Sequence, residues 1–224
     1  MTIGKLIEEI LTDIGFATDG GSISDAQSKR TLNFINEVLQ ELNRNDFLHF
    51  SKDLVQLPRT NDTEFILNDA PLKVDKLSFI MDRGVYRVKP VMLEAFVNYL
   101  DGSFARYPRA FVYDRIFREG VMVGRIRIDR PSSFQLVAVV TNNLENYTDN
   151  AQQIALPVDY VALVKTGVQY KLLANSGADE SLKRSKSFEY TSIMESIKRS
   201  MFVGIDNSKS VETLDVIHTG AGRL

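Results

Sequence analysis

Residues 157–174 are Pro-Val-Asp-Tyr-Val-Ala-Leu-Val-Lys-Thr-Gly-Val-Gln-Tyr-Lys-Leu-Leu-Ala. Apolar side chains recur on one side at the spacing of an α-helix, at Val158, Val161, Val164, Val168 and Leu172. The Asn-Ser-Gly sequence at 175–177 ends this helix, and another long helix is predicted to begin near Asp179. Its apolar stripe consists of Tyr190, Ile193, Met194, Ile197 and Met201. The C-terminal part of the chain therefore predicts a pair of helices.

A second helix pair is predicted at the N-terminus. Apolar residues within 2–14 have helical spacing, and Gly15 occupies the position of a C-cap glycine. Ser24 and Gln27 have the spacing of a capping box, which places the start of the next helix there and its end near Asn45. Two amphipathic helices joined by a short loop are expected to form an antiparallel pair.

Between the helix pairs, short segments rich in β-branched and aromatic residues predict strands. They are residues 50–57, 64–67, 76–81, 85–88, 110–117, 121–129 and 134–141. Turn sequences such as Arg118-Glu119-Gly120 separate them, so we expect an antiparallel meander. Pro90, at the first helical position, opens one short helix. The apolar face of that helix holds Met92, Leu93, Phe96, Val97 and Leu100.

The predicted fold class is α+β. We expect a four-helix bundle built from the N- and C-terminal helix pairs, with an inserted antiparallel β region. The expected divisions are 1–46 for the N-terminal helix pair, 47–150 for the β-rich insert with one short helix, 151–203 for the C-terminal helix pair and 204–224 for a C-terminal arm. The arm has weak periodicity, and we expect it to be mobile when the protein is alone.

Composition limits the chemistry of the 224 residues. There is no cysteine, which excludes disulfides, thiolate catalysis, Cys-ligated zinc and iron–sulfur clusters. The two histidines are His49 and His218, and the net charge of −2 argues against a strong polyanion binder. No apolar run approaches the ~20 residues that cross a bilayer, and no signal peptide is apparent at the N-terminus. We expect a soluble, unsecreted protein without membrane contact.

Motifs for enzymatic chemistry are missing from the sequence. Neither a Gly-x4-Gly-Lys-Ser/Thr phosphate loop nor a Gly-x-Ser-x-Gly nucleophile motif occurs. His49, between aromatic residues, is interpreted as structural. Asp62 and Glu64 are interpreted as part of a solvated loop, and Asp179 and Glu180 as the start of a helix. The sequence therefore predicts no catalytic, cofactor-binding or metal site, and not an enzyme.

Positive charge is concentrated in residues 83–130, which contain ten Lys and Arg, nine of them Arg, against five Asp and Glu. Five of the arginines fall on adjacent strands and turns of one predicted hairpin: Arg115, Arg118, Arg125, Arg127 and Arg130. Arg125 and Arg127 share one face of their strand. Such a row could bind phosphates or the carboxylates of a neighbouring subunit, or it could be a solvated sheet face.

The order of several short fragments resembles one known family. The fragments are Phe47-Leu48-His49-Phe50, Leu57-Pro58, Tyr107-Pro108, Arg127-Ile128-Asp129-Arg130-Pro131, Val137-Ala138-Val139-Val140, Ile154-Ala155-Leu156-Pro157-Val158-Asp159-Tyr160 and Ala174-Asn175-Ser176-Gly177. Over roughly Met1 to Phe202, the chain resembles the head-to-tail adaptors of short-tailed bacteriophages, also called tail accessory or packaged-DNA stabilisation factors. It departs from them in its large β insert and in its long loop at 142–150.

The resemblance implies a dodecameric ring below the portal, located at the head–tail junction of the virion and in the host cytoplasm during assembly. The ring would extend the DNA channel, help to retain the packaged DNA without sequence-specific binding, and carry the tail nozzle. The arm would dock on the portal, and the portal would template ring closure. Its candidate contact residues are Ile205, Val211, Leu214, Val216, Ile217, Arg223 and Leu224. The Arg-rich hairpin would lie at a subunit or nozzle contact, or would face the channel.

Two other functions fit the same residues. One is a different head-completion protein, such as a stopper or a tail-tube terminator, which would bind an adaptor or a tube rather than the portal. The other is a small nucleic-acid-binding module that uses the Arg-rich hairpin and the aromatic residues of the β region as a stacking platform.

Overall fold

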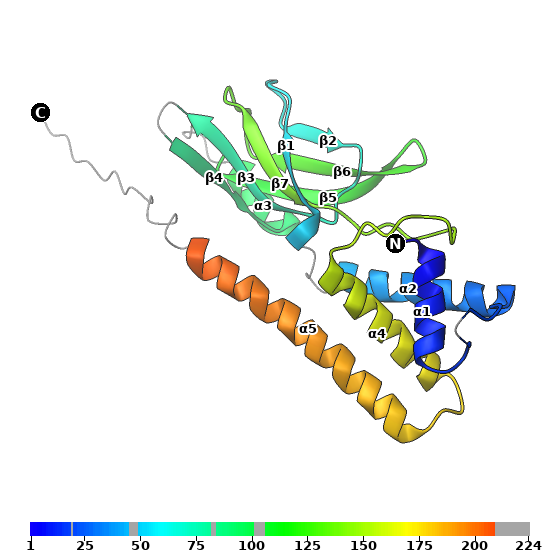
Figure 1. Ribbon diagram of the computed structural model, residues 1–224. Coiled ribbons are helices and arrows are strands. Elements are labelled where there is room, and N and C mark those ends of the chain that lie inside the picture. The colour runs from blue at the N-terminus through cyan, green and yellow to red at the C-terminus, as the bar shows by residue number, and fades with distance from the viewer. Residues whose placement is uncertain (19, 45–48, 82–83, 101–105, 209–224) are drawn as a thin grey trace, which may run out of the picture. The chain divides into compact units, whose positions relative to one another are not determined.

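The computed structural model describes residues 1–18, 20–44, 49–81, 84–100 and 106–208 (Figure 1). The chain forms two compact units. The helical unit comprises residues 1–47 and 146–224, and the sheet unit comprises residues 48–145.

The helices of the helical unit are α1 (Ile3–Asp13), α2 (Asp25–Arg44), α4 (Val158–Ala174) and α5 (Glu180–Ser208). The sheet unit contains the 3-10 helix η1 (His49–Ser51), the helix α3 (Leu93–Leu100) and the strands β1 (Lys52–Gln56), β2 (Glu64–Leu67), β3 (Lys73–Met81), β4 (Gly84–Pro90), β5 (Ala110–Arg118), β6 (Val121–Ile128) and β7 (Leu136–Thr141).

Two predicted helix-end signals are confirmed. The Gln27 N–H donates to Ser24 Oγ at 3.3 Å and the Ser24 N–H donates to Gln27 Oε1 at 3.2 Å, which is the reciprocal pattern of a capping box before α2. Gly15 follows α1 with a φ of 73°, the left-handed conformation that glycine adopts without steric cost. These local interactions set where α1 ends and α2 begins.

Helix α4 is buried on all sides from Leu163 to Leu173. Its buried residues are Tyr160, Leu163, Val164, Thr166, Gly167, Val168, Gln169, Leu172 and Leu173. A one-sided stripe had been expected, yet its first member, Val158, is exposed. Contacts with α1, α2 and α5 surround α4, so it is a central helix rather than one corner of a bundle. The predicted four-helix bundle with an inserted β region is therefore wrong.

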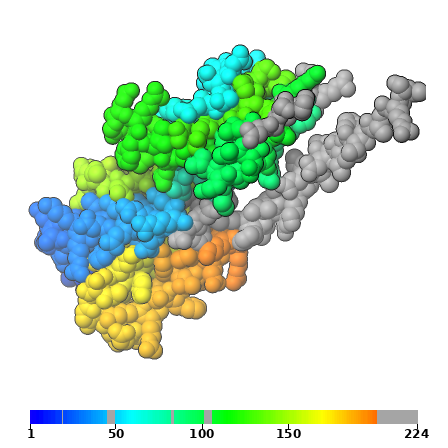
Figure 2. Space-filling model, turned by 180° about the vertical axis from the view of Figure 1, so that it is seen from behind, coloured from blue at the N-terminus to red at the C-terminus, as the bar shows by residue number. Residues whose placement is uncertain are grey.

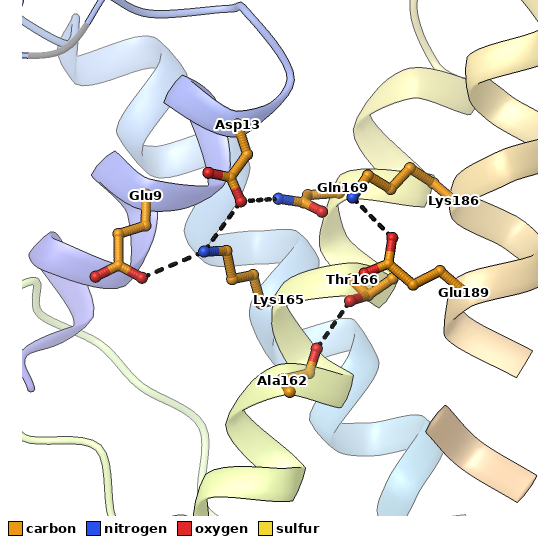
Figure 3. Close-up of polar contacts among 8 residues, drawn as sticks. All are labelled: Glu9, Asp13, Ala162, Lys165, Thr166, Gln169, Lys186 and Glu189. Atoms are coloured by element: carbon orange, nitrogen blue, oxygen red, sulfur yellow. Dashed lines mark hydrogen bonds and ion pairs between the residues drawn. The ribbon is translucent and has the colours of Figure 1, made fainter. Parts of the chain in front are cut away.

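On the side of α1, the polar side chains of α4 are paired (Figure 3). Lys165 Nζ lies 3.3 Å from Glu9 Oε2 and 3.0 Å from Asp13 Oδ2. Gln169 Nε2 donates to the same Asp13 oxygen at 2.9 Å. Burial alone would raise the pKa of the Asp13 carboxyl, but the hydrogen bonds from Lys165 and Gln169 hold it below its ordinary value.

The side of α4 that faces α2 has a second ion-pair group. Lys171 Nζ lies 2.6 Å from Glu41 Oε1 and 3.5 Å from Glu37 Oε2. Burial raises the pKa of the Tyr190 phenol, on α5, to about 12, and the negative charge of Glu41 adds to this effect. Residues of three helices therefore interact around Lys171.

A glycine allows α5 to approach α4. A Cβ atom at Gly167 would lie 2.7 Å from Cε2 of the Tyr190 ring, which is closer than side chains tolerate. Because the ring rests directly on the α4 backbone, any larger residue at 167 must displace Tyr190.

The sheet unit is a curled, mixed seven-stranded sheet with the order β1-β7-β3-β4-β5-β6-β2 (Figure 1). All neighbouring strands are antiparallel except β4 and β5, which pair in parallel through Lys89↔Ala110 and Pro90↔Phe111. The expected antiparallel meander is therefore wrong here, and it is also wrong at β7, which pairs with β1 and β3 rather than with β6. Helix α3 lies between β4 and β5 in the chain and provides the crossover that a parallel pair requires. Pro90 ends β4, and α3 begins at Leu93 rather than at the proline.

The two faces of the curled sheet differ in what covers them. The inner face carries the main core of the unit, formed by Leu57, Phe65, Leu67, Val74, Leu77, Phe79, Val88, Phe111, Ile126, Ile128, Leu136, Ala138 and Val140. The opposite, outer face is covered at β5 by α3, whose Phe96 packs against Ala110 and Val112. Within the described ranges, no helix has both the length and the apolar character needed to cross a membrane.

We predict that Gly167→Val destabilises the helical unit. The β-branched side chain would overlap the Tyr190 ring, and overpacking of this kind costs about 1–3 kcal/mol in the free energy of unfolding. Urea unfolding followed by far-UV circular dichroism measures the loss.

Gly177→Val is the matched control. A Cβ at position 177 has no atom within 4 Å, so its effect should stay within about 0.5 kcal/mol. Equal unfolding midpoints for the Gly167→Val variant and the unmodified chain would contradict the close packing of α4 against α5.

Candidate protein interaction site

The β5–β6 hairpin determines where the predicted arginines lie. The strands pair up to Arg118↔Val121, and Glu119 and Gly120 form the two-residue turn with φ values of 55° and 82°. Two positive φ angles are characteristic of the tight turns that match the twist of a hairpin. This register places Asp114 directly opposite Arg125.

Arg125 and Arg127 are paired within the sheet rather than free. Arg125 Nε donates to Asp114 Oδ1 at 2.9 Å and its Nη2 donates to Oδ2 at 2.7 Å, a bidentate pair. Arg127 Nη2 donates to the same Oδ2 at 3.2 Å. Glu64, on β2, lies 3.8 Å from Arg125. Hydrogen bonding to Arg125 is the main reason that the pKa of Asp114 lies below its ordinary value, although burial opposes it.

Arg130 is also engaged inside the sheet unit. Its Nε donates to Asp129 Oδ2 at 3.0 Å, and the Asp129 side chain is fully buried. The other oxygen of Asp129 accepts the backbone N–H groups of Arg109 at 2.8 Å and Ala110 at 3.0 Å. This carboxylate therefore joins the end of β6 to the start of β5, and Arg130 balances its charge.

The remaining two arginines lie at the end of the hairpin, in a group that we call the hairpin tip. The hairpin tip consists of Arg115, Phe117, Arg118, Val121 and Met122, all of them exposed. Phe117 is 74% exposed, which is unusual for an aromatic side chain in a strand. Arg115 and Arg118 point to opposite faces, because side chains alternate along β5. The structure thus separates the five predicted arginines into three paired residues and two at the tip.

The predicted arm is only partly within the described residues. Ile205 belongs to the last turns of α5, which continues to Ser208. The other predicted arm residues lie outside the described residues, namely Val211, Leu214, Val216, Ile217, Arg223 and Leu224. The same holds for His218 and for the side chain of His49.

The acidic pairs singled out in the sequence have structural contacts. Glu64 pairs with Arg125, as described above. Asp179 accepts the Ser181 N–H at 3.2 Å and the Ser181 hydroxyl at 2.6 Å, which lowers the pKa of the carboxyl at the start of α5. In the part of the chain that the structure describes, no group of three or more His, Asp or Glu residues is arranged to hold a metal ion.

Sequence reasoning predicted the apolar face of α3 but missed that most of this face stays exposed. Only Phe96 of the predicted face is buried, and Tyr99 lies half-buried beside it. Leu93, Val97 and Leu100 have the spacing i, i+4, i+7 of a stripe next to Phe96, and all three are exposed. The sequence did contain a signal for this exposure. An eight-residue helix with so many apolar residues cannot bury all of them against one sheet.

No protein-family model matches the chain, and a search of curated proteins finds no match. The chemistry of the site therefore has to be argued from its geometry. That geometry consists of a paired arginine row behind an exposed tip of apolar and cationic side chains.

We predict that Asp114→Asn destabilises the sheet unit by about 1.5–3 kcal/mol near neutral pH, the range for hydrogen bonds to charged groups. The change leaves two guanidinium groups, each about three-quarters buried, without their carboxylate. Because folding lowers the Asp114 pKa, the contribution is fully present above the unfolded value near 3.8 and is lost as the pH falls through the folded pKa. Urea unfolding at a series of pH values measures it.

Glu119→Gln, at the exposed turn of the same hairpin, provides the control and should leave stability nearly unchanged. A gap between the unmodified chain and Asp114→Asn that stays constant down to strongly acidic pH would refute the assigned role of the carboxylate.

Proposed function

We propose that the chain is a structural virion protein, a head-to-tail adaptor of a short-tailed bacteriophage. Copies of it form a ring, expected to be dodecameric, below the portal protein. The ring extends the DNA channel, helps to retain packaged DNA and provides the attachment platform for the tail nozzle. The order of the sequence fragments supports this assignment, together with the exposed surfaces described above.

The composition of the hairpin tip is the observation that carries the proposal. Arginine, aromatic residues and methionine are enriched at protein–protein interfaces, and the tip presents all three kinds. Its largest side chain, Phe117, gains contact with apolar atoms only when a partner covers it. We assign the hairpin tip to the contact with the tail nozzle.

The paired arginines favour a protein partner over a nucleic acid. A row of free guanidinium groups would attract phosphates and release their counterions. Arg125 and Arg127 instead share the carboxylate of Asp114, and Glu64 lies beside them. The positive charge of the row is thus largely balanced within the sheet.

The length of helix α5 supports the proposal that the C-terminal arm docks on the portal. Tyr190 rests on Gly167, nine residues after the start of α4, whereas α5 continues for eighteen residues beyond Tyr190. At 3.6 residues per turn, α5 therefore runs about two and a half turns past the start of α4. Residues 209–224 begin at the end of this rod, and we propose that they dock on the portal.

Truncation after Ser208 is predicted to abolish binding to the portal ring while leaving the fold intact. This end point keeps α5 whole, which a deletion from Gly204 would not. Co-elution of the chain with the portal ring encoded by the same genome, in size-exclusion chromatography, measures binding, and circular dichroism checks the fold.

A chain with residues 209–224 in scrambled order separates the effect of sequence from that of length and charge, and we expect it not to bind. Normal ring assembly by the truncated chain would contradict the proposal that the arm docks on the portal.

For the hairpin tip, we predict that Phe117→Ser weakens nozzle binding about tenfold or more, as expected for losing an aromatic anchor at an interface. Portal binding should be retained. Phe188→Ser is the matched control, because Phe188 is 78% exposed but lies on α5. Nozzle uptake at the unmodified level by portal-bound Phe117→Ser rings, measured by sedimentation, would show that the tip is not the nozzle contact.

A further inference from the structure

Helix α3 and the residue before it present an apolar stripe that no described part of the sheet unit covers. The exposed fractions are 79% for Met92, 50% for Leu93, 57% for Val97 and 54% for Leu100. Phe96, which neighbours this stripe at i+3 from Leu93, is buried against β5. The space-filling view shows the green segment around residues 90–100 at the surface of the sheet unit (Figure 2). We call these four residues the α3 stripe.

A second apolar surface lies on the outer face of β1, β7, β3 and β4. It consists of Leu54, Ile80, Val85, Val137 and Val139, and we call it the outer band. Leu54 pairs with Val139 and Ile80 pairs with Val85 across neighbouring strands. Val137 lies opposite Ser78, which places it diagonally next to Ile80. Leu54, Ile80 and Val85 are each more than half exposed.

These two surfaces are of the two kinds that commonly pack together, a helix face and a sheet face. Sheets bury an apolar face under helices, and α3 does this for β5. Within the described part of the sheet unit, the outer band has no such helix. The α3 stripe is a helix face without a sheet, and the outer band is a sheet face without a helix.

The charges beside the two surfaces are also complementary. Glu94 is the one charged residue in the sequence of α3. Lys76, Arg87 and Lys89 are exposed on the outer face, since they alternate with the buried Leu77 and Val88. Among the residues that the structure describes, none of these four charged side chains has an ion-pair partner. One carboxylate thus stands beside the helix face, and three cations stand beside the sheet face.

We propose that the α3 stripe of one copy packs on the outer band of the next copy, with Glu94 against the cations of that face. Because the two surfaces differ, the contact is heterologous and can repeat from copy to copy until a ring closes. The ring itself rests on the proposed function. The contact between copies can be tested without a portal.

The small area of the contact explains why it would form only during assembly and not between free chains. The four side chains of the α3 stripe expose on the order of 400 Å², about half of the ~800 Å² that each partner of a stable complex buries. Such a contact is weak between free chains. It becomes effective when neighbouring copies are held side by side, because the local concentration then replaces the bulk concentration.

Cysteine cross-linking tests the contact directly, since the chain contains no native cysteine. Val97→Cys and Ile80→Cys chains are mixed at high concentration and treated with a short bismaleimide. We expect heterodimers in clear excess over the homodimers of either variant. Ser192→Cys, at an exposed position on α5, gives the background of random collisions.

A chain carrying both substitutions distinguishes a repeating contact from a closed pair. A heterologous contact gives a ladder of dimers, trimers and larger species, whereas a two-fold dimer stops at two chains. Glu94→Lys should lower the heterodimer yield about threefold, the scale of an exposed ion pair. Combining it with a partner that carries Arg87→Glu and Lys89→Glu should restore the yield.

A heterodimer yield at the Ser192→Cys background, a preference for Val97→Cys homodimers, or products that stop at dimers would overturn the proposal. So would an unchanged yield for Glu94→Lys. These results would leave the adaptor function untouched if the chain still saturates a portal ring. Conversely, a ladder without portal binding would support the contact and count against the adaptor.

Discussion

From Leu163 to Leu173, helix α4 has no exposed residue, and the arrangement of the helical unit depends on this constraint. A helix buried on all sides must have its polar side chains paired where they lie. Lys165 meets carboxylates of α1, and Lys171 meets carboxylates of α2. Gly167 lets the ring of Tyr190 lie directly on the helix, which fixes α5. These three positions on one helix define where each of its three neighbours sits, and α5 then carries the chain beyond α4.

In the helical unit, polar side chains are paired in the interior. In the sheet unit, by contrast, apolar side chains lie at the surface. Because Arg125 and Arg127 are both paired with Asp114, their charges are largely balanced and do not attract phosphates. The exposed apolar side chains include those of the hairpin tip, the α3 stripe, and Leu54, Ile80 and Val85 of the outer band. A protein that assembles with several partners needs several such surfaces, each distinct from the others. We propose the nozzle for the tip, neighbouring copies for the other two, and the portal for the C-terminal arm.

Local signals in the sequence predict most element boundaries, because capping boxes, turn residues and apolar periodicity act within a few residues. They do not predict the arrangement. The parallel pairing of β4 with β5 depends on where Phe96 of α3 packs, and the burial of α4 depends on helices far away in the sequence. The arginine row was visible in the sequence, but its pairing was not inferred. The two-residue turn at Glu119 and Gly120 sets the register, so it could have identified Asp114 as the partner of Arg125.

The most direct test of the proposed assembly role is mass photometry of the purified chain, alone and mixed with the portal ring encoded by the same genome. We expect a monomer of 25.3 kDa alone, and a portal ring whose mass grows until one chain is bound per portal subunit. A portal ring whose mass does not change at saturating chain concentration would contradict the adaptor function.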